Sequence, residues 1–144
     1  MQIGKAIMSP PESPTPVGAR QLKILLVDDA SPVRNMIKYM LAKEGFYDIT
    51  EASNGKEALE ILKNQKVDLV IADLLMPQIS GLELLEKAKE IDSANNIKFI
   101  MISGSDSKEN IVKAIQLGAS YYLLKPISAK VLLRKVITIY LEKS

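Results

Sequence analysis

Three aspartates stand directly after apolar runs of the kind that form buried strands. Asp28 and Asp29 follow the run Ile24–Val27, and Asp73 follows the run Leu69–Ala72. Carboxylates that lie close together repel one another, so a cluster of three indicates a bound hard cation. Mg²⁺ binds such groups together with water and phosphate oxygens. Alone, Asp28 and Asp29 are more simply interpreted as strand-end and helix-cap residues, but the addition of Asp73 favours a metal site.

A hydroxyl and an ammonium group stand at the ends of two further runs. Ser103 follows the run Phe99–Ile102, and Lys125 follows the run Tyr121–Leu124. By themselves, a serine before a glycine usually belongs to a turn and a single lysine is usually solvated. A phosphoryl group on a carboxylate, however, needs a divalent ion, an opposing positive charge and a hydrogen-bond donor. Because aspartate is a known covalent acceptor of phosphoryl groups, the side chains together predict a phosphoryl-accepting site.

Strand-like and helix-like stretches alternate along the chain and would position these side chains. The predicted strands are Ile24–Val27, Tyr47–Ala52, Leu69–Ala72, Phe99–Ile102 and Tyr121–Leu124. The predicted helices are Pro32–Glu44, Gly55–Asn64, Gly81–Ile91, Lys108–Leu117 and Ala129–Glu142. This alternation predicts an α/β fold, a doubly wound (βα)5 flavodoxin-like three-layer sandwich around a parallel sheet. In that fold, sites form at the carboxyl ends of the strands, where the strand order reverses.

The apolar pattern also predicts which strands lie at the edges of the sheet. Strands that are buried on both faces are continuously apolar, whereas edge strands tolerate polar positions. Residues 47–52 alternate between apolar and polar, and the run 121–124 begins with two tyrosines. These two strands are therefore expected at the edges, as in the strand order 2-1-3-4-5 known from flavodoxin and a chemotaxis regulator.

Helix boundaries carry local signals of their own. Ser31 before Pro32 is typical of an N-cap followed by a proline in the first turn. Capping-box spacing occurs in Asn54…Glu57, Ser80…Glu83 and Asp106…Glu109. Gly45 and Gly118 stand where a left-handed residue commonly ends a helix.

The composition excludes several classes of function. The 144 residues include no cysteine and no histidine, which excludes disulfides, thiolate nucleophiles, Ser-His triads and histidine metal ligands. With 19 Lys and Arg against 17 Asp and Glu, the net charge of +2 gives no argument for binding nucleic acid or a membrane surface. No apolar run approaches the ~20 residues of a membrane span, and Met1–Met8 lack a signal-peptide pattern. A cytoplasmic protein is expected.

The beginning of the chain differs in composition from the rest. Four of the seven prolines fall within Ser9–Pro16, a stretch that cannot form a helix or a sheet ladder. We therefore expect residues 1–21 to form a disordered, proline-rich tail and residues 22–144 to form the folded domain. A proline-rich ligand for an SH3-type domain is the alternative interpretation of the tail.

Residues 23–143 resemble the receiver domain of two-component response regulators, in a combination of motifs that is specific. The resemblance is carried by Val27-Asp28-Asp29, Asp73-Leu74-Leu75-Met76-Pro77, Ser103 and Lys125-Pro126. It implies that residues 22–144 are a receiver domain and that Asp73 is the phosphoacceptor. The Mg²⁺ ligands that it implies are Asp28, Asp29, Asp73 and the backbone carbonyl of Leu75.

The resemblance also implies a mechanism of switching. Asp73 would accept a phosphoryl group from a phosphohistidine, Ser103 and Lys125 would bind that group, and Tyr122 would turn inward. The fourth helix, fifth strand and fifth helix would then present a changed face to a downstream protein, without direct contact to nucleic acid. The implied phosphodonor is a sensor histidine kinase or a histidine phosphotransfer protein. Lys125-Pro126 is typically a cis bond in this family.

Such a domain is not an enzyme, although it assists its own phosphorylation and dephosphorylation. It is expected as a monomer or a phosphorylation-dependent dimer.

Three alternative interpretations of the chain stay open. A flavodoxin-like mononucleotide binder needs a hydroxyl- or glycine-rich loop after the first strand, where this chain has Asp28-Asp29-Ala30-Ser31-Pro32. A haloacid-dehalogenase-like phosphatase needs Asp-x-Asp, whereas position 75 is leucine. The chain could also be the receiver of a larger regulator whose output domain, for example a DNA-binding one, is absent.

Overall fold

Strands and helices alternate strictly along residues 18–92 and 96–143, the part of the chain that the computed structural model describes. The strands are β1 (Ile24–Val27), β2 (Ile49–Ala52), β3 (Leu69–Asp73), β4 (Lys98–Ser103) and β5 (Tyr121–Leu124). The helices are α1 (Ser31–Ala42), α2 (Gly55–Asn64), α3 (Gly81–Ile91), α4 (Lys108–Gln116) and α5 (Ala129–Lys143). The predicted tail, residues 1–21, falls mostly outside the described residues, which begin at Gly18.

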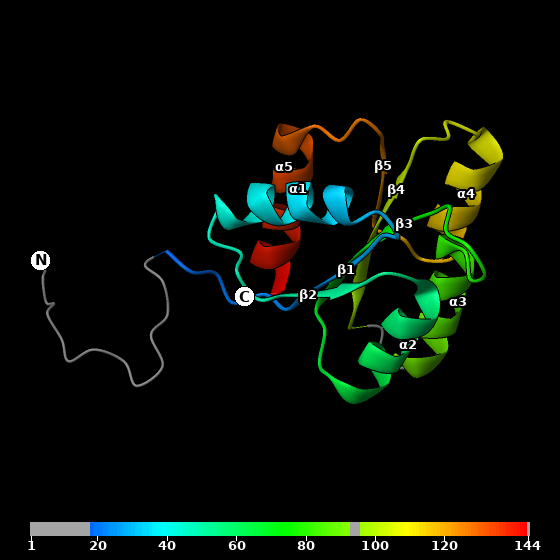
Figure 1. The fold of residues 1–144 in the computed structure, drawn as a ribbon, viewed down its shortest axis with the longest axis horizontal. Coiled ribbons are helices and arrows are strands. Elements are labelled where there is room, and N and C mark those ends of the chain that lie inside the picture. Colours follow the sequence, from blue (N-terminus) through cyan, green and yellow to red (C-terminus); the bar gives the residue numbers. More distant parts are fainter. Residues whose placement is uncertain (1–17, 93–95, 144) are drawn as a thin grey trace, which may run out of the picture.

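The strands form one parallel sheet in the order β2-β1-β3-β4-β5 (Figure 1). The predicted flavodoxin-like fold and its strand order are therefore confirmed. From β1 the chain runs outward to β2 and then crosses back to β3 on the other side of β1. The carboxyl ends of β1 and β3 consequently meet where the strand order reverses, which is the place predicted for the site.

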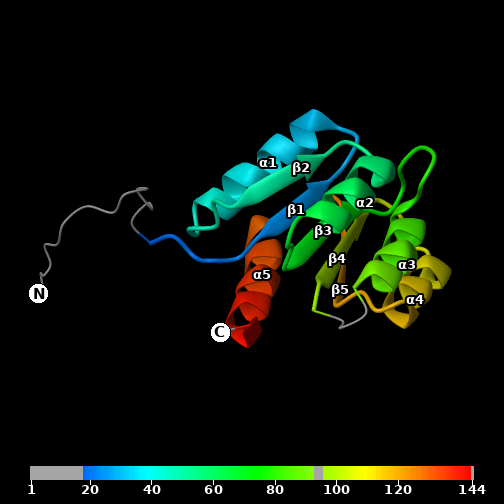
Figure 2. The ribbon, with the colours of Figure 1, turned by 90° about the horizontal axis from the view of Figure 1, so that it is seen from below.

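Helices cover both faces of the sheet, as Figures 1 and 2 show. Helices α1 and α5 cover one face through Ile37, Leu41, Leu132, Val136 and Ile139. Helices α2, α3 and α4 cover the other face through Ala58, Leu62, Leu84, Leu85, Ala88 and Ala114. Because side chains alternate across a strand, Leu25 and Val27 lie in this second core, whereas Ile24 and Leu26 lie in the first. Among the described helices, none is long and apolar enough to span a membrane.

Burial along each strand follows its position in the sheet. Every residue of β1 and β3 is buried, and in β4 only Lys98 is partly exposed. In β2 and β5, by contrast, most residues are partly exposed. The apolar pattern of the sequence therefore identified the two edge strands correctly, because only central strands are covered on both faces and flanked on both sides.

Several of the predicted helix boundaries are confirmed. The hydroxyl of Ser80 accepts the backbone N–H of Glu83, and the Glu83 carboxylate accepts the backbone N–H of Ser80, which completes a capping box at α3. The side chain of Asn54 accepts a backbone N–H at the start of α2. Gly45 and Gly118 have φ values of 86° and 106°, so both take the left-handed conformation predicted after a helix.

Two of the predicted caps are wrong. Helix α1 begins at Ser31, and its N-cap is Ala30, which makes no side-chain cap bond. The carboxylate of Asp28 instead accepts the N–H of Ala30 at 2.8 Å, so an acidic side chain closes the turn before α1. Helix α4 is capped by Ser107 and not by Asp106. Both residues are good N-caps, so local spacing alone does not decide between them.

The segment before β1 is held against α5 and the loop between α1 and β2 by Arg20. Its N–H donates to the carbonyl of Gly45 at 2.7 Å. Its guanidinium carbon lies 5.4 Å from the ring centroid of Phe46 and 5.6 Å from that of Tyr140. A Cβ at position 45 would lie 2.2 Å from the carbonyl oxygen of Gly18, so this close approach of two backbone segments requires glycine.

A cluster of charged side chains joins the edge strand β2 to α1. Glu51 of β2 accepts hydrogen bonds from Arg34 Nε at 2.9 Å and from Lys38 Nζ at 2.7 Å. These two bonds hold the pKa of Glu51 below its ordinary value, and the bond from Lys38 has the larger effect. A carboxyl group whose pKa is lowered by folding stabilises the fold at pH values above its pKa in the unfolded chain. That contribution is lost as the pH falls through the folded pKa.

Replacing Glu51 with Gln is expected to lower the free energy of unfolding by about 1 kcal/mol at neutral pH, the upper end for partly exposed pairs. The loss should shrink in acid, because wild-type Glu51 then becomes uncharged as well. Urea unfolding at neutral pH and near pH 3 measures both effects. Glu60→Gln is the control, because Glu60 and Lys63 form an exposed pair at 3.8 Å. Equal losses in the two variants would contradict this prediction.

Candidate functional site

The three aspartates lie together where the carboxyl ends of β1 and β3 meet. Val27 of β1 pairs with Ala72 of β3, so the next residues, Asp28 and Asp73, emerge at the same edge of the sheet. Carboxylate oxygens of Asp28, Asp29 and Asp73 lie within 4.8 Å of one another. Asp28 and Asp73 are buried, whereas Asp29 is exposed. This acidic cluster could hold a metal ion, and its exposed member borders the solvent.

Backbone N–H groups orient the two buried carboxylates. Asp28 Oδ1 accepts the N–H of Ala30 at 2.8 Å, and Asp73 Oδ1 accepts the N–H of Leu75 at 3.2 Å. In both cases the donor is two residues further along the chain, which is the Asx-turn pattern. Each carboxylate is therefore held by one oxygen against its own backbone, and its second oxygen is available to other groups.

Lys125 approaches these second oxygens. Its Nζ lies 3.3 Å from Asp73 Oδ2 and 3.6 Å from Asp28 Oδ2. Strand β4 separates β5 from β3, so the long lysine side chain reaches past the end of β4. The backbone fixes its origin, because the N–H of Lys125 donates to the carbonyl of Ser103 at 2.8 Å. The Lys125-Pro126 peptide bond is cis, as the family resemblance implied.

The surroundings of Asp73 disfavour its charged form. Burial raises the pKa of the Asp73 carboxyl above its ordinary value, and the neighbouring carboxylate of Asp28 adds to the increase. The N–H of Leu75 and the ammonium of Lys125 lower this pKa without offsetting the burial. Two of the three carboxylates, Asp28 and Asp73, thus share the ammonium group of Lys125, and a divalent cation would supply the missing positive charge.

Ser103 and Tyr122 are joined through the backbone of Ser105. The buried hydroxyl of Ser103 accepts the N–H of Ser105 at 3.0 Å. The hydroxyl of Tyr122 donates to the carbonyl of Ser105, also at 3.0 Å. Asp73 pairs with Ile102, so Ser103 lies one residue further along β4 at the same edge of the sheet. Both residues predicted to form the switch therefore contact one loop next to Asp73.

This arrangement of acidic cluster, lysine and serine agrees with a comparison of the sequence with protein families. The profile described as "response regulator receiver domain" matches residues 24–137, a range that includes all of the predicted site residues. The chain belongs to this family. The receiver is accordingly CheY-like, and the predicted identity of the domain is confirmed.

Individual relatives support the assignment. "Chemotaxis protein CheY" of Bacillus subtilis is 41% identical over 107 residues, which are 74% of this chain and 88% of that protein. A CheY-like receiver of Methanospirillum hungatei is 34% identical, with a TM-score of 0.77 over 85% of this chain and 96% of that one. A Burkholderia pseudomallei response regulator, solved with a phosphorylated aspartic acid, calcium and citrate, is 25% identical. Its TM-score is 0.70 over 78% of this chain and 65% of that one.

Leu75 is the exposed apolar residue among the predicted site residues of the receiver. The side chain is 60% exposed beside the acidic cluster, and only its N–H contacts Asp73. An apolar side chain therefore borders the approach to Asp73. The use of the Leu75 carbonyl as a metal ligand stays a prediction.

Two residues that position the acidic cluster of the receiver were missed at the level of sequence. Arg34 Nη1 donates to the backbone carbonyl of Asp28 at 2.5 Å. The N–H of Gly81 donates to the carbonyl of Leu74 at 2.7 Å, which ties the start of α3 to the end of β3. The signal for Arg34 would have been Glu51, an acidic residue on the neighbouring edge strand. Nothing in the sequence alone shows how closely Gly81 approaches β3.

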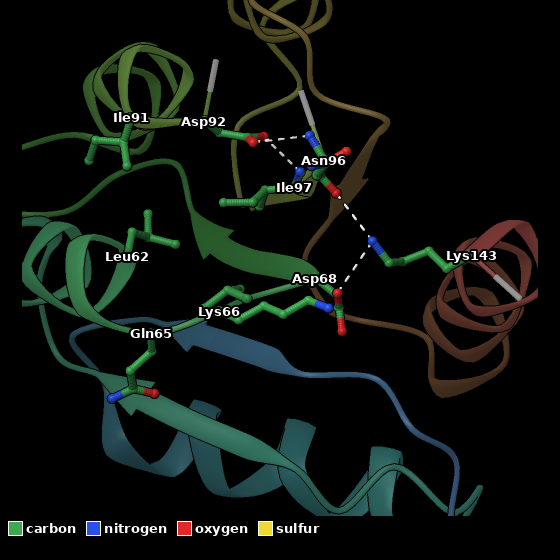
Figure 3. A pocket seen from close by; sticks show the side chains of 10 residues that line it. Leu62, Gln65, Lys66, Asp68, Ile91, Asp92, Asn96, Ile97 and Lys143 are labelled. Carbon is green, nitrogen blue, oxygen red and sulfur yellow. Dashed lines mark hydrogen bonds and ion pairs between the residues drawn. The ribbon is translucent and has the colours of Figure 1, made fainter. Parts of the chain in front are cut away.

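A pocket of about 320 Å³ lies at the opposite end of the sheet (Figure 3). It is lined by Leu62, Gln65, Lys66, Val67, Asp68, Ile91, Asp92, Asn96, Ile97 and Lys143. Asp68 pairs with Lys143 at 3.3 Å and accepts the N–H of Lys23 at 2.9 Å. The Asp92 carboxylate accepts the N–H groups of Asn96 and Ile97. Both carboxylates of this pocket are therefore engaged in holding elements of the receiver together.

Proposed function

We propose that this receiver is a phosphorelay switch, in which Asp73 accepts a phosphoryl group from a phosphohistidine of a partner protein. The observation that carries the proposal is the position of Lys125, whose Nζ lies 3.3 Å from Asp73 Oδ2 beside two further carboxylates. The partner is a sensor histidine kinase or a histidine phosphotransfer protein. The phosphorylated aspartic acid in the Burkholderia pseudomallei relative supports the same chemistry here.

The acidic cluster fits Mg²⁺ as the resident cation. Its donors are carboxylate oxygens, and Mg²⁺ is bound in proteins by one or two carboxylates, water and phosphate oxygens. Asp28, Asp29, Asp73 and the backbone carbonyl of Leu75 would hold the cation, with the exposed Asp29 as the more direct ligand of the acidic pair. When bound, the cation neutralises charge that develops on the transferred phosphoryl group.

The residues of the chain then act in sequence. A carboxylate oxygen of Asp73 forms a bond to phosphorus while the bond from phosphorus to the imidazole nitrogen breaks. The electron pair of the broken bond stays on that nitrogen, which takes up a proton from solvent. Lys125 pairs with the phosphoryl oxygens, because its ammonium already lies against the acceptor oxygen. The hydroxyl of Ser103 leaves the N–H of Ser105 and donates to the same group.

Phosphorylation replaces the single negative charge of the Asp73 carboxylate with a phosphoryl group that carries about −1.5 to −2 units of charge. Movement of Ser103 disturbs Ser105, and with it the hydrogen bond that holds the hydroxyl of Tyr122. The α4-β5-α5 face is where this change is read by a downstream protein. Exposed apolar side chains of Val112, Ile115 and Leu124 on α4 and β5 suit a protein partner. The receiver acts in the cytoplasm without direct contact to nucleic acid, and it is a signalling domain rather than an enzyme.

The proposal is tested by intact-protein mass after incubation with acetyl phosphate. With Mg²⁺ the receiver is expected to gain the mass of one phosphoryl group, because the cation completes the charge balance of the site. With a chelator in excess the gain should be lost, and added Mg²⁺ should restore it. Transfer from a phosphorylated histidine kinase domain, followed in the same way, tests the natural donor chemistry. Labelling that proceeds equally well in the chelator would contradict a metal-dependent site.

A further inference from the structure

Arg34 links the edge strand β2 to the backbone of the acidic cluster. Its Nε donates to Glu51 Oε1 at 2.9 Å, and its Nη1 donates to the carbonyl oxygen of Asp28 at 2.5 Å. The side chain is only 15% exposed, so both bonds are shielded from water. The planar guanidinium presents its donors in a fixed fork, and a carboxylate on one side therefore fixes the direction of the donor on the other.

The peptide that follows Asp28 is the one that carries Asp29. Asp28 is held by its N–H, which donates to the carbonyl of Ala52 at 3.2 Å, and by its side chain, which accepts the N–H of Ala30. Arg34 holds the remaining group, the carbonyl. In the described part of the chain, no hydrogen bond or ion pair reaches the carboxylate of Asp29. Its orientation is therefore set by its own backbone.

We infer that Arg34 is a positioning residue for the metal site: it fixes the Asp28–Asp29 peptide, aims the Asp29 carboxylate at the cation and raises metal affinity. This inference rests on the metal binding that the proposed function assumes. Residues that orient metal ligands typically change metal affinity about 10- to 100-fold when they are replaced. Because Arg34 acts through the backbone and not through a ligand atom, the lower end of that range is expected, about tenfold.

A purely structural role of Arg34 is the competing explanation, since the same side chain joins α1 to β2. Lys38 separates the two explanations, because it binds the other oxygen of the same Glu51 carboxylate at 2.7 Å. Among the described hydrogen bonds and ion pairs, Lys38 has none to Asp28. Loss of Lys38 therefore weakens the joint between α1 and β2 without releasing the Asp28 carbonyl.

The test is a Mg²⁺ titration of the full chain, followed by the amide NMR resonances of Asp29 and Ala30. Arg34→Lys keeps the positive charge and loses the fork, so its Mg²⁺ dissociation constant is expected to rise about tenfold. Lys38→Met is the matched control, and its dissociation constant should stay within about twofold of the wild type. The thermal midpoint of each metal-free variant reports on stability independently of metal affinity.

The inference is overturned if Arg34→Lys binds Mg²⁺ as tightly as Lys38→Met does. Should Arg34→Lys fail to fold, Glu51→Gln takes its place, because it leaves Arg34 present but removes the carboxylate that directs the fork. Glu51→Gln should then weaken Mg²⁺ binding about threefold relative to Lys38→Met, and no difference between the two would again overturn the inference.

The titration also separates this inference from the proposed function. A wild-type receiver that binds Mg²⁺ without becoming phosphorylated by acetyl phosphate would remove the proposed function and leave the role of Arg34 intact. A receiver that is phosphorylated normally while Arg34→Lys retains full Mg²⁺ affinity would remove only the role of Arg34. A wild type without any Mg²⁺ response would overturn both.

Discussion

Asp73→Asn is expected to abolish phosphoryl labelling of the receiver by acetyl phosphate and Mg²⁺. The amide has the same shape as the carboxylate, but its oxygen is neutral and cannot serve as the nucleophile that forms an acyl phosphate. Lys125 and Ser103 remain in place in the variant, so loss of labelling would not reflect loss of the surrounding groups. Intact-protein mass, with the wild type in parallel, measures the outcome.

The control for this variant is Asp68→Asn. Asp68 directly precedes the same strand β3 at the opposite end of the sheet, where it pairs with Lys143. Its replacement removes a buried carboxylate from the domain but leaves the acidic cluster unchanged, so labelling is expected to persist. Equal labelling of Asp73→Asn and wild type would show that another residue accepts the phosphoryl group.

Stability should change in the opposite direction to function in Asp73→Asn. The pKa of Asp73 is raised by burial and by the neighbouring Asp28, so the charged carboxylate is a net cost to the metal-free fold at neutral pH. The neutral amide removes that cost. Urea unfolding without divalent metal should therefore show a higher free energy of unfolding for Asp73→Asn than for the wild type.

Gly81→Ala is expected to destabilise the receiver by about 1–3 kcal/mol, the usual range for overpacking a filled interior. A Cβ at position 81 would lie 2.5 Å from the carbonyl oxygen of Asp73 and 2.7 Å from the α-carbon of Leu74. Met101 Cε, also at 2.7 Å, is the end of a flexible side chain and can move. The two backbone atoms cannot, so α3 must shift away from the end of β3.

That shift would also reach the phosphoacceptor, because the Asp73 carbonyl is one of the atoms displaced. We therefore expect slower labelling of Gly81→Ala in addition to its lower stability, both measured on the same preparation. Gly104→Ala is the matched control, since a Cβ at position 104 meets nothing within 4 Å. Its free energy of unfolding should stay within about 0.5 kcal/mol of the wild type. A similarly small change in Gly81→Ala would contradict the predicted clash.

Much of the fold was predictable because the pattern of apolar and polar residues in each strand reflects the position of that strand in the sheet. Continuous apolar runs marked β1, β3 and β4, and polar positions marked the edges, since a strand that is buried on both faces needs apolar residues at successive positions. Helix caps were less predictable. Ser107 caps α4 in place of Asp106, and Asp28 closes the turn at Ala30, because adjacent residues of similar capping ability compete and tertiary contacts decide.

The order of residues along the chain was enough to predict which groups stand at the carboxyl ends of the strands: Asp28, Asp29, Asp73, Ser103 and Lys125. Strand ends are marked by the sequence, and a parallel sheet collects them at one edge. The contacts within that edge depend on how the folded elements pack. These include the approach of Lys125 to two carboxylates, the fork of Arg34 and the close packing of Gly81. These contacts join residues from different parts of the chain that lie only a few ångströms apart in space. Such distances are set by the packing of the whole domain, so no local pattern in the sequence predicts them.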